Sequence, residues 1–418
     1  MSCIRKFMLC KEHELRVEVE FKDNVTVKLT GGTAEIFGTE IAVDQQLLTF
    51  SGTKFAIFTW QGAELELSGS SFNAYIADET PMVNYINTHS ILHSRRVAAQ
   101  EAEVSGQGPI TMVVGPTDSG KSSLCKLLVN YAVRQGQKPL LVDLDLGQGM
   151  ITLPGTVGAT AVQRPIDPVQ ESLLLEAPLI YFFGQTSPKE NPELYRHYVE
   201  HMAEILRRRN ANYAVGRAAG LVINSMGWVD GLGYELLLHS ARALRATVLI
   251  VLEDRLHSEL EKEFSGTDVE VLKMPKSGGV VMRTVDFRKM TRSSKISEYF
   301  YGVDGKLNIT TWVKKFSEVS VYKIGCGPRA PSSALPLGAK PTANPLRVAP
   351  VEWTRELQNS VLAITYAISP DDLLTSNVAG FIWVTEVDVQ RGQVTYQAPC
   401  QGELPTTIFL AGDLKFYE

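Results

Sequence analysis

The segment Gly115-Pro-Thr-Asp-Ser-Gly120-Lys121-Ser122 constrains this chain more than any other part of its sequence. It matches the pattern G-x-x-x-x-G-K-S and lies between an apolar run, Ile110–Val114, and an amphipathic pattern over Ser122–Arg134 that predicts a helix. A strand, a glycine-rich loop and a helix in this order are the context that a phosphate-binding loop requires. The segment therefore predicts a nucleoside triphosphate site at the start of the helix.

The chemistry expected of this loop follows from its residue types. Lys121 would bridge the β- and γ-phosphates, and the hydroxyl of Ser122 would bind Mg²⁺. The chain has no Asn-Lys-x-Asp segment to read guanine and no Asp-x-x-Gly placed as a GTPase switch, which favours ATP over GTP. The residues predicted to bind the nucleotide here are Gly115, Pro116, Thr117, Asp118, Ser119, Gly120, Lys121, Ser122 and Ser123.

A change of pattern along the chain predicts three domains. Residues 1–95 contain short alternating runs between Gly-containing turns, which indicate a small β-sandwich or barrel. Between 96 and 302 strands and helices alternate, which predicts an α/β domain with a doubly wound, mostly parallel sheet. Residues 303–418 show further strand-like runs and a Pro/Ala/Gly-rich stretch, Gly327–Pro350, and we expect a small β-rich domain with a long loop inside it.

Composition excludes several classes of protein. Hydrophobic residues make up 44% of the chain and charged residues 21%, which is typical of a folded globular protein. No apolar run reaches the roughly 18–20 residues of a membrane span, so we expect no membrane partner. The formal net charge of −5 means that any contact with nucleic acid requires a local basic surface. The five cysteines form no C-x-x-C pair, which argues against a zinc site or a disulfide framework.

Two aspartates follow the next predicted strand, Leu140–Val142, in the string Asp143-Leu-Asp145-Leu-Gly-Gln148-Gly149. An acidic residue at a strand end beside a phosphate-binding loop would hold Mg²⁺ as a Walker B aspartate does. The other carboxylate would accept a proton from an attacking hydroxyl. The alternative is a turn with two solvated aspartates. We expect Asp145 to serve the metal because it lies nearer the carboxyl end of the strand, with Asp143 as a second candidate ligand.

Two further segments at predicted strand ends have the composition of a site for the molecule that would accept the phosphoryl group. Trp228 lies among glycines in Asn224-Ser-Met-Gly-Trp-Val-Asp-Gly, where its ring either stacks on a nucleobase or caps the edge of the core. Gly184-Gln-Thr186-Ser187-Pro188 offers hydroxyls and backbone amides that would suit a backbone phosphate.

A basic helix is predicted after Pro275-Lys-Ser-Gly-Gly. Arg288 and Arg292 share one face of it at i,i+4, an arrangement that destabilises a helix unless anions neutralise the charges. Such a helix would form a lid whose arginines stabilise a transferring phosphoryl group. A solvated basic face is the alternative.

Taken together, these segments closely resemble the eukaryotic polyribonucleotide 5′-hydroxyl kinases. The resemblance rests on the phosphate-binding loop, Asp-Leu-Asp-Leu-Gly-Gln-Gly, Ile-Asn-Ser-Met-Gly-Trp, Pro-Lys-Ser-Gly-Gly-Val-Val and Ile296-Ser-Glu-Tyr-Phe-Tyr-Gly302. It extends into the first domain through Glu12-His-Glu-Leu-Arg16 and Thr33-Ala-Glu-Ile-Phe37-Gly-Thr-Glu40.

The resemblance implies roles for individual residues. Asp145 would bind Mg²⁺ and help to activate a 5′-hydroxyl, together with Lys121 as a catalytic residue. The lid arginines Arg283 and Arg288 would contact the phosphates during transfer. The residues expected to contact RNA are Trp228, Thr186, Ser187 and Gln148, and those expected to contact adenine from the N-terminal domain are Glu14 and Phe37.

The family also implies a cellular setting. Its members are subunits of the pre-mRNA cleavage and polyadenylation machinery and associate with the tRNA-splicing endonuclease, so we expect a nuclear protein with these partners. The leading hypothesis is an ATP- and Mg²⁺-dependent kinase that phosphorylates the 5′-OH end of RNA. A catalytically silent, ATP-bound scaffold and an ATPase that ignores RNA ends are the alternatives. The choice between RNA and DNA would rest on contacts to the 2′-hydroxyl, and the sequence assigns no residue to them.

Overall fold

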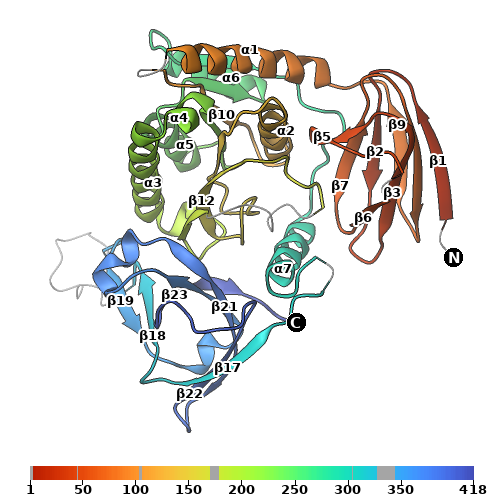
Figure 1. The fold of residues 1–418 in the computed structure, drawn as a ribbon. Helices are drawn as coiled ribbons and strands as arrows, with labels where there is room; N and C mark the ends of the chain where they lie inside the picture. Colours follow the sequence, from red (N-terminus) through yellow and green to blue (C-terminus); the bar gives the residue numbers. More distant parts are fainter. Residues whose placement is uncertain (1–2, 45, 103–105, 170–177, 304, 327–343) are drawn as a thin grey trace.

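The computed structural model describes residues 3–44, 46–102, 106–169, 178–303, 305–326 and 344–418. Figure 1 shows a β-sandwich at the N-terminal end, a central α/β part, and a β-rich part that carries the C-terminus. This arrangement confirms the predicted fold class. Most of the predicted loop Gly327–Pro350 lies outside the described residues.

The N-terminal part consists of two antiparallel sheets with the strand orders β1-β8-β3-β6 and β5-β4-β7-β2-β9. Val25, Val27 and Leu29 on β3 are buried and alternate with more exposed residues, so the strand turns one face to the shared core. The strands are β1 (Cys3–Leu9), β2 (Glu14–Glu18), β3 (Val25–Gly32), β4 (Glu35–Ile36), β5 (Thr39–Glu40), β6 (Gln46–Phe50), β7 (Lys54–Phe58), β8 (Ala63–Gly69) and β9 (Asn73–Ala77).

The central sheet has the order β13-β12-β11-β14-β10-β15-β16, and β12 is antiparallel to both of its neighbours. The sequence did not predict β12, because its Thr, Gly and Ala side chains lack the large apolar groups that mark a buried strand. The strands are β10 (Ile110–Val114), β11 (Leu140–Asp143), β12 (Thr156–Ala161), β13 (Leu179–Phe182), β14 (Leu221–Asn224), β15 (Val248–Val251) and β16 (Glu270–Lys273).

Helices cover both faces of this sheet. Val113 of β10 packs with the side chains of α2, whereas Met112 and Val114 belong to the core under α3, α5 and α6. Both faces of the strand are therefore buried, which explains its continuous apolar run. The helices are α1 (Met82–Glu101), α2 (Lys121–Arg134), α3 (Pro192–Asn212), α4 (Ala214–Ala219), α5 (Leu232–Ala243), α6 (Asp254–Glu263) and α7 (Val285–Tyr301). The sequence did not predict α4 and α6. The predicted domain boundary at residue 95 falls within α1.

The C-terminal part is a seven-stranded sheet of order β17-β22-β21-β20-β23-β18-β19 with a core of its own. All of its strand pairs are antiparallel except β18–β23. The strands are β17 (Thr310–Lys315), β18 (Ser320–Ile324), β19 (Val348–Val351), β20 (Ser360–Thr365), β21 (Val378–Asp388), β22 (Gln393–Ala398) and β23 (Ile408–Lys415).

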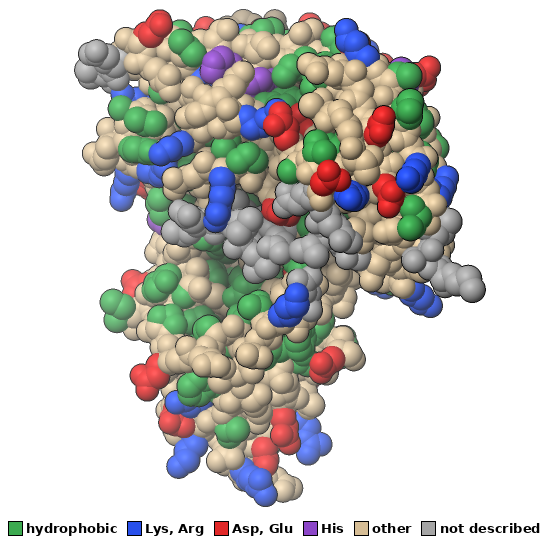
Figure 2. Space-filling model, turned by 45° about the vertical axis from the view of Figure 1, so that its right-hand side comes forward, with side chains coloured by type: hydrophobic (Ala, Val, Ile, Leu, Met, Phe, Trp, Pro, Cys, Tyr) green, Lys and Arg blue, Asp and Glu red, His purple; other side chains and the backbone are tan. Residues whose placement is uncertain are grey.

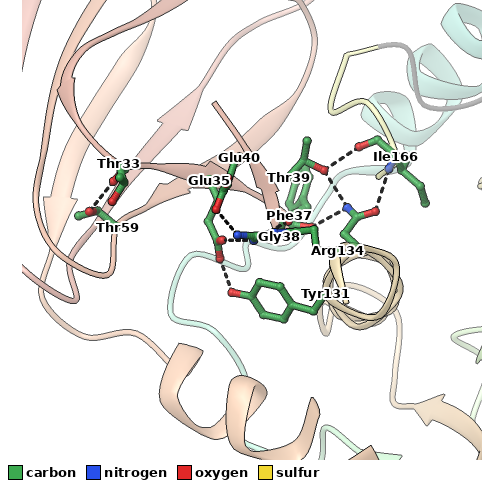
Figure 3. Close-up of polar contacts among 11 residues, drawn as sticks. Thr33, Glu35, Phe37, Gly38, Thr39, Glu40, Thr59, Tyr131, Arg134 and Ile166 are labelled. Atoms are coloured by element: carbon green, nitrogen blue, oxygen red, sulfur yellow. Dashed lines mark hydrogen bonds and ion pairs between the residues drawn. The ribbon is translucent and has the colours of Figure 1, made fainter. Parts of the chain in front are cut away.

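Polar contacts join the β4–β5 hairpin of the sandwich to α2 (Figure 3). The buried Glu35 carboxylate accepts hydrogen bonds from the hydroxyl of Tyr131 and from the guanidinium of Arg134, the latter at 2.8 Å. Arg134 also donates to the carbonyl oxygen of Gly38 at 3.1 Å. Asn130 Nδ2 donates to the carbonyl oxygen of Phe37 at 2.8 Å. The helix that starts at the phosphate-binding loop is thus fixed to the N-terminal part at its other end.

Two observations concern membrane-spanning helices and disulfide bonds. In the described ranges no helix combines the length and apolar character needed to cross a bilayer. The four cysteines whose side chains are described are unpaired.

Substitution Arg134→Ala tests the contact between hairpin and helix. It leaves the buried Glu35 carboxylate without its cation, so we expect a loss of about 2 kcal/mol in the free energy of unfolding. Urea denaturation measures this. The control is Arg208→Ala on α3, which removes an ion pair to Glu204 within one helix and should cost less than about 0.5 kcal/mol. Equal losses in both variants would contradict the role given to Arg134.

Candidate nucleotide and acceptor site

The phosphate-binding loop leaves the end of β10 and turns into α2. Gly120, directly before the helix, has a φ of 91°, in the left-handed region that favours glycine. No side chain caps the first turn of α2, so its backbone N–H groups are available to an anion. Gly115 and Pro116 precede the turn of the loop, and the Pro116 carbonyl accepts hydrogen bonds from Lys121 Nζ at 2.7 Å and from Ser119 Oγ at 2.8 Å.

A cavity of about 350 Å³ opens over this loop. It is lined by most of the residues that the sequence predicted for phosphate, metal, lid and acceptor. Those residues are Thr117, Asp118, Ser119, Gly120, Lys121, Ser122, Ser123, Asp145, Gln148, Thr186, Ser187, Trp228, Arg283 and Arg288. Segments that lie far apart in sequence therefore meet around one space.

The cavity lining contains more basic than acidic side chains, namely Lys54, Lys121, Arg283, Arg288 and Arg292 against Asp118 and Asp145. The face shown in Figure 2, by contrast, mixes acidic and basic side chains. Lys121 is buried beside Asp145 and Asp118. Burial lowers the pKa of the Lys121 ammonium, and the two carboxylates oppose that shift. The local basic surface that a protein of net charge −5 needs in order to bind polyanions is thus present inside the cavity.

The two aspartates differ in environment. Asp143 is buried at the end of β11, and its carboxylate accepts hydrogen bonds from Asn224 Nδ2 at 2.8 Å and from the Met150 amide at 2.6 Å. Burial and the neighbouring Asp145 raise the pKa of Asp143 to about 6. Asp145 lines the cavity instead. Burial also raises the pKa of Asp145, while Lys121 counteracts the shift.

Ser122 and Asp145 offer hydroxyl and carboxylate oxygens, the ligands that Mg²⁺ prefers. Among the described residues no group of three or more His, Cys, Asp or Glu side chains could hold a metal by itself. This donor set fits an ion that takes its remaining ligands from phosphate and water. Ser122 Oγ also lies 3.4 Å from Asn224 Oδ1, to which it donates a hydrogen bond.

The lid segment docks on the phosphate-binding loop through Asp118. Its carboxylate Oδ2 accepts one hydrogen bond from the backbone amide of Arg283 at 2.9 Å and another from Arg288 Nη2 at 2.6 Å. The Nε of Arg288 is buried and has no hydrogen-bond partner. Burial and the nearby Arg288 lower the pKa of Arg292, which also lines the cavity. Asp118 thus pairs with the Arg288 guanidinium, while Arg292 adds a second positive charge to the cavity lining, which suits this end of the cavity to an incoming anion.

The acceptor segments line the same cavity as the lid. Trp228 packs over Gly233 at the start of α5, so closely that a Cβ there would lie 2.5 Å from the indole ring. Trp228 therefore both covers the core edge and lines the cavity. Thr186 and Ser187 are exposed in the loop after β13. The Oε1 of Gln148 is buried without a hydrogen-bond partner.

A second cavity, of about 130 Å³, lies between the sandwich and the start of α2. Glu14 and Phe37, the predicted adenine contacts, line it. Glu14 is buried and accepts hydrogen bonds from Arg16 Nε at 2.6 Å and from Thr80 Oγ1 at 2.9 Å. The residues that line both cavities are Lys54, Gly120, Ser123, Gly279 and Val280. The two spaces are therefore adjacent parts of one site.

Sequence reasoning missed several of these residues. Lys54 belongs to β7 of the sandwich, and nothing in its local sequence distinguishes it from a solvated strand lysine. Asn224 was seen only as part of the Trp228 segment, although its position at the end of β14, beside β11, offered a signal. Arg292 was expected on the lid through its helical spacing with Arg288, but the family resemblance assigned phosphate contacts only to Arg283 and Arg288.

Comparison with known families gives a consistent result along the chain. Residues 115–302 match the mRNA cleavage and polyadenylation factor CLP1 P-loop, and residues 8–99 match the N-terminal beta-sandwich domain of polyadenylation factor. Residues 310–418 match the family described as pre-mRNA cleavage complex II protein Clp1.

Relatives in other organisms align over almost the full length. The chain is 46% identical over 422 residues to a protein named CLP1 homolog from Arabidopsis thaliana, which covers 99% of this chain and 95% of the relative. It is 42% identical over 415 residues to the polyribonucleotide 5′-hydroxyl-kinase Clp1 of Homo sapiens, with 99% and 96% covered. The fold is similar to that of Clp1p in a solved complex with Pcf11p, with a TM-score of 0.85 at 24% identity, covering 99% of this chain and 98% of that one.

Substitution Asp118→Ala tests the contact between loop and lid. It removes the acceptor for the Arg283 amide and the Arg288 guanidinium, so the first turn of α7 should open more often. We expect amide hydrogens of residues 283–288 to exchange about tenfold faster in the ligand-free protein. The matched control is Asp286→Ala, which removes an exposed carboxylate from the same turn. Unchanged exchange rates in the Asp118 variant would show that this contact does not hold the first turn of α7 closed.

Proposed function

The chain belongs to the Clp1 family of mRNA cleavage and polyadenylation factors, and we propose that it is an RNA kinase of that family. It transfers the γ-phosphate of ATP to the 5′-hydroxyl end of RNA and acts in pre-mRNA 3′-end processing. The observation that carries this proposal is the single cavity of about 350 Å³ in which the phosphate-binding loop, Asp145, the lid arginines and Trp228 meet.

The positions of the residues around the site suggest how ATP is bound for the reaction. ATP would place its base in the cavity near Glu14 and Phe37 and its phosphates over the first turn of α2. Lys121 would leave the Pro116 carbonyl and turn to the β- and γ-phosphates. Arg283 and Arg288 would stabilise the charge that spreads over the oxygens of the transferring group.

The acceptor would enter from the opposite side. Trp228 would stack on the terminal base, while Thr186, Ser187 and Gln148 would contact the strand next to it. Asp145 would accept the proton of the 5′-hydroxyl, since its carboxylate lines the cavity whereas that of Asp143 is occupied by backbone and amide donors. Catalysis would thus consist mainly of positioning and charge stabilisation.

Mg²⁺ is the cofactor that this donor set fits. Ser122 and Asp145 would hold the ion beside the phosphates, and Asp143 would support Asp145. When bound there, Mg²⁺ would supply positive charge that offsets the charge of the phosphates.

The family places this activity in RNA processing. The solved relative is bound to Pcf11p, and we propose a corresponding partner in the cleavage and polyadenylation machinery for this chain. We further propose association with the tRNA-splicing endonuclease and a nuclear location, as the sequence resemblance implied. A catalytically silent scaffold is disfavoured because the four residues to which the sequence resemblance gives catalytic roles, Lys121, Asp145, Arg283 and Arg288, all line one cavity.

The reaction is tested directly with γ-labelled ATP and an oligoribonucleotide that carries a 5′-hydroxyl. The protein should transfer label to the RNA, and Lys121→Ala should lower kcat by at least about 100-fold, because the γ-phosphate loses its main cation. The control is Lys189→Ala, an exposed lysine beyond the cavity lining. Absence of label on the RNA from folded protein would exclude the kinase, and phosphate release that RNA ends do not redirect would indicate an ATPase.

Substitution Trp228→Ala separates acceptor binding from ATP binding. Loss of a stacking surface should cost about 1–3 kcal/mol, equivalent to a rise of roughly 5- to 150-fold in the KM for RNA. The KM for ATP should change less than about twofold. Steady-state kinetics with each substrate varied in turn measures both values. Equal rises in the two KM values would contradict the stacking role.

A further inference from the structure

The loop that carries Thr186 and Ser187 has little support from the central sheet. It follows β13, which lies at the edge of that sheet with β12 as its one neighbour. The amides of Phe183 and Gly184 both donate to the Gly155 carbonyl at 2.9 Å. After a half-buried Gln185, Thr186 and Ser187 are exposed and lead to the short 3-10 helix Pro188–Glu190. The position of the loop must therefore be fixed from another side.

The C-terminal domain provides that support through β23. The backbone amide of Asp413 donates to the Gly184 carbonyl at 2.7 Å. The Asp413 carboxylate accepts a hydrogen bond from Gln185 Nε2 at 2.5 Å through one oxygen and from Lys323 Nζ at 2.6 Å through the other. Partial burial opposes its ionisation, but the bonds from Lys323 and Gln185 prevail and lower the pKa of Asp413. An ion pair between β18 and β23 thus places the Asp413 carboxylate, which in turn accepts a hydrogen bond from Gln185 of the loop.

The backbones touch at the same place. A Cβ added to Gly412 would lie 2.3 Å from the Cα of Gly184, so no side chain fits between β23 and the loop. Gly184 itself has a φ of 78°, a conformation that other residues rarely adopt. Two glycines that face each other allow the loop to approach β23 closely enough for the backbone hydrogen bond.

Packing alone does not hold this interface. A cavity of about 250 Å³ lies beside the contact, lined among others by Phe183, Gln185, Lys323 and Gly412. Because the space is not filled by side chains, the loop would be free to shift if the polar contacts were lost. The side-chain contacts of Asp413 therefore act together with the backbone hydrogen bond and the glycine contact to restrain this side of the loop.

The same domain also contacts the lid helix. The backbone amide of Phe381 on β21 donates to the hydroxyl of Tyr299 near the end of α7 at 3.0 Å. The ring of Phe381 lies 5.7 Å from that of Phe182 on β13. One strand of the C-terminal domain thus bridges the strand that precedes the acceptor loop and the helix that carries the lid arginines.

We propose that the C-terminal domain sets the acceptor side of the site, with Asp413 as a positioning residue that holds Thr186 and Ser187 where the RNA end binds. This inference rests on the proposed kinase function. It gives the C-terminal domain a role in RNA binding rather than in nucleotide binding, since Asp413 bonds to the loop that carries Thr186 and Ser187.

The test is Asp413→Ala in the full-length chain, with label transfer from ATP to a 5′-hydroxyl oligoribonucleotide as the readout. The KM for RNA should rise about tenfold while the KM for ATP stays within about twofold. Gln185→Ala removes the same link from the loop side and should have a similar effect. The double variant should be no worse than either single one, because both substitutions break one bridge.

The control is Asp388→Ala, which removes a carboxylate of the same domain that caps the turn after β21 and pairs with Arg391. It should leave both KM values unchanged. An unchanged KM for RNA in the Asp413 variant, an equal rise in the KM for ATP, or additive losses in the double variant would each overturn the inference.

A binding measurement separates this inference from the kinase proposal. A fluorescent 5′-hydroxyl oligoribonucleotide is titrated in the presence of a non-hydrolysable ATP analogue, and its anisotropy gives a Kd without catalysis. A wild-type protein that binds this RNA but transfers no label would exclude the kinase. In that case a higher Kd for the Asp413 variant than for the wild type would still support the positioning role. Equal Kd values in wild type and variant would exclude that role whatever the activity.

Discussion

The unpartnered backbone amides at the start of α2 are the constraint on which the rest of this structure depends. A helix leaves its first N–H groups without internal partners, and here no side chain caps them. Together with Lys121 they form a site that an anion completes. The side chains around this site also favour an anion, because Arg288 and Arg292 add positive charge that Asp118 balances only in part. The molecule is organised to receive a highly charged phosphate chain.

The helix also links the domains. Its first turn faces the phosphate cavity, and its last turns hold the sandwich through Asn130, Tyr131 and Arg134. The predicted base-binding residues Glu14 and Phe37 are therefore set at a fixed distance from the phosphate-binding loop. On the opposite side Asp413 ties the acceptor loop to the C-terminal sheet. In the proposed mechanism each flanking domain would serve one substrate, the N-terminal one the nucleotide and the C-terminal one the acceptor.

Local sequence predicted the parts whose structure is determined locally. The phosphate-binding loop, the buried strand before it and the helix after it follow from residue pattern alone, as does the aspartate at the end of β11. The strand β12 was missed because its small side chains carry no periodic signal. Lys54 and Asp413 escaped notice for a different reason. Their roles arise from contacts across long sequence separations, and no spacing within a segment records which loop a distant strand will touch.

The central claim is that ATP and the RNA end meet in the cavity above the phosphate-binding loop. A crystal structure with an ATP analogue, Mg²⁺ and a short 5′-hydroxyl RNA tests it most directly. The account predicts the γ-phosphorus within about 3.5 Å of the 5′ oxygen and in line with it, with Asp145 beside that oxygen and Trp228 against the terminal base. An RNA end bound outside this cavity would contradict the account. So would a 5′ oxygen that the lid holds away from the γ-phosphate.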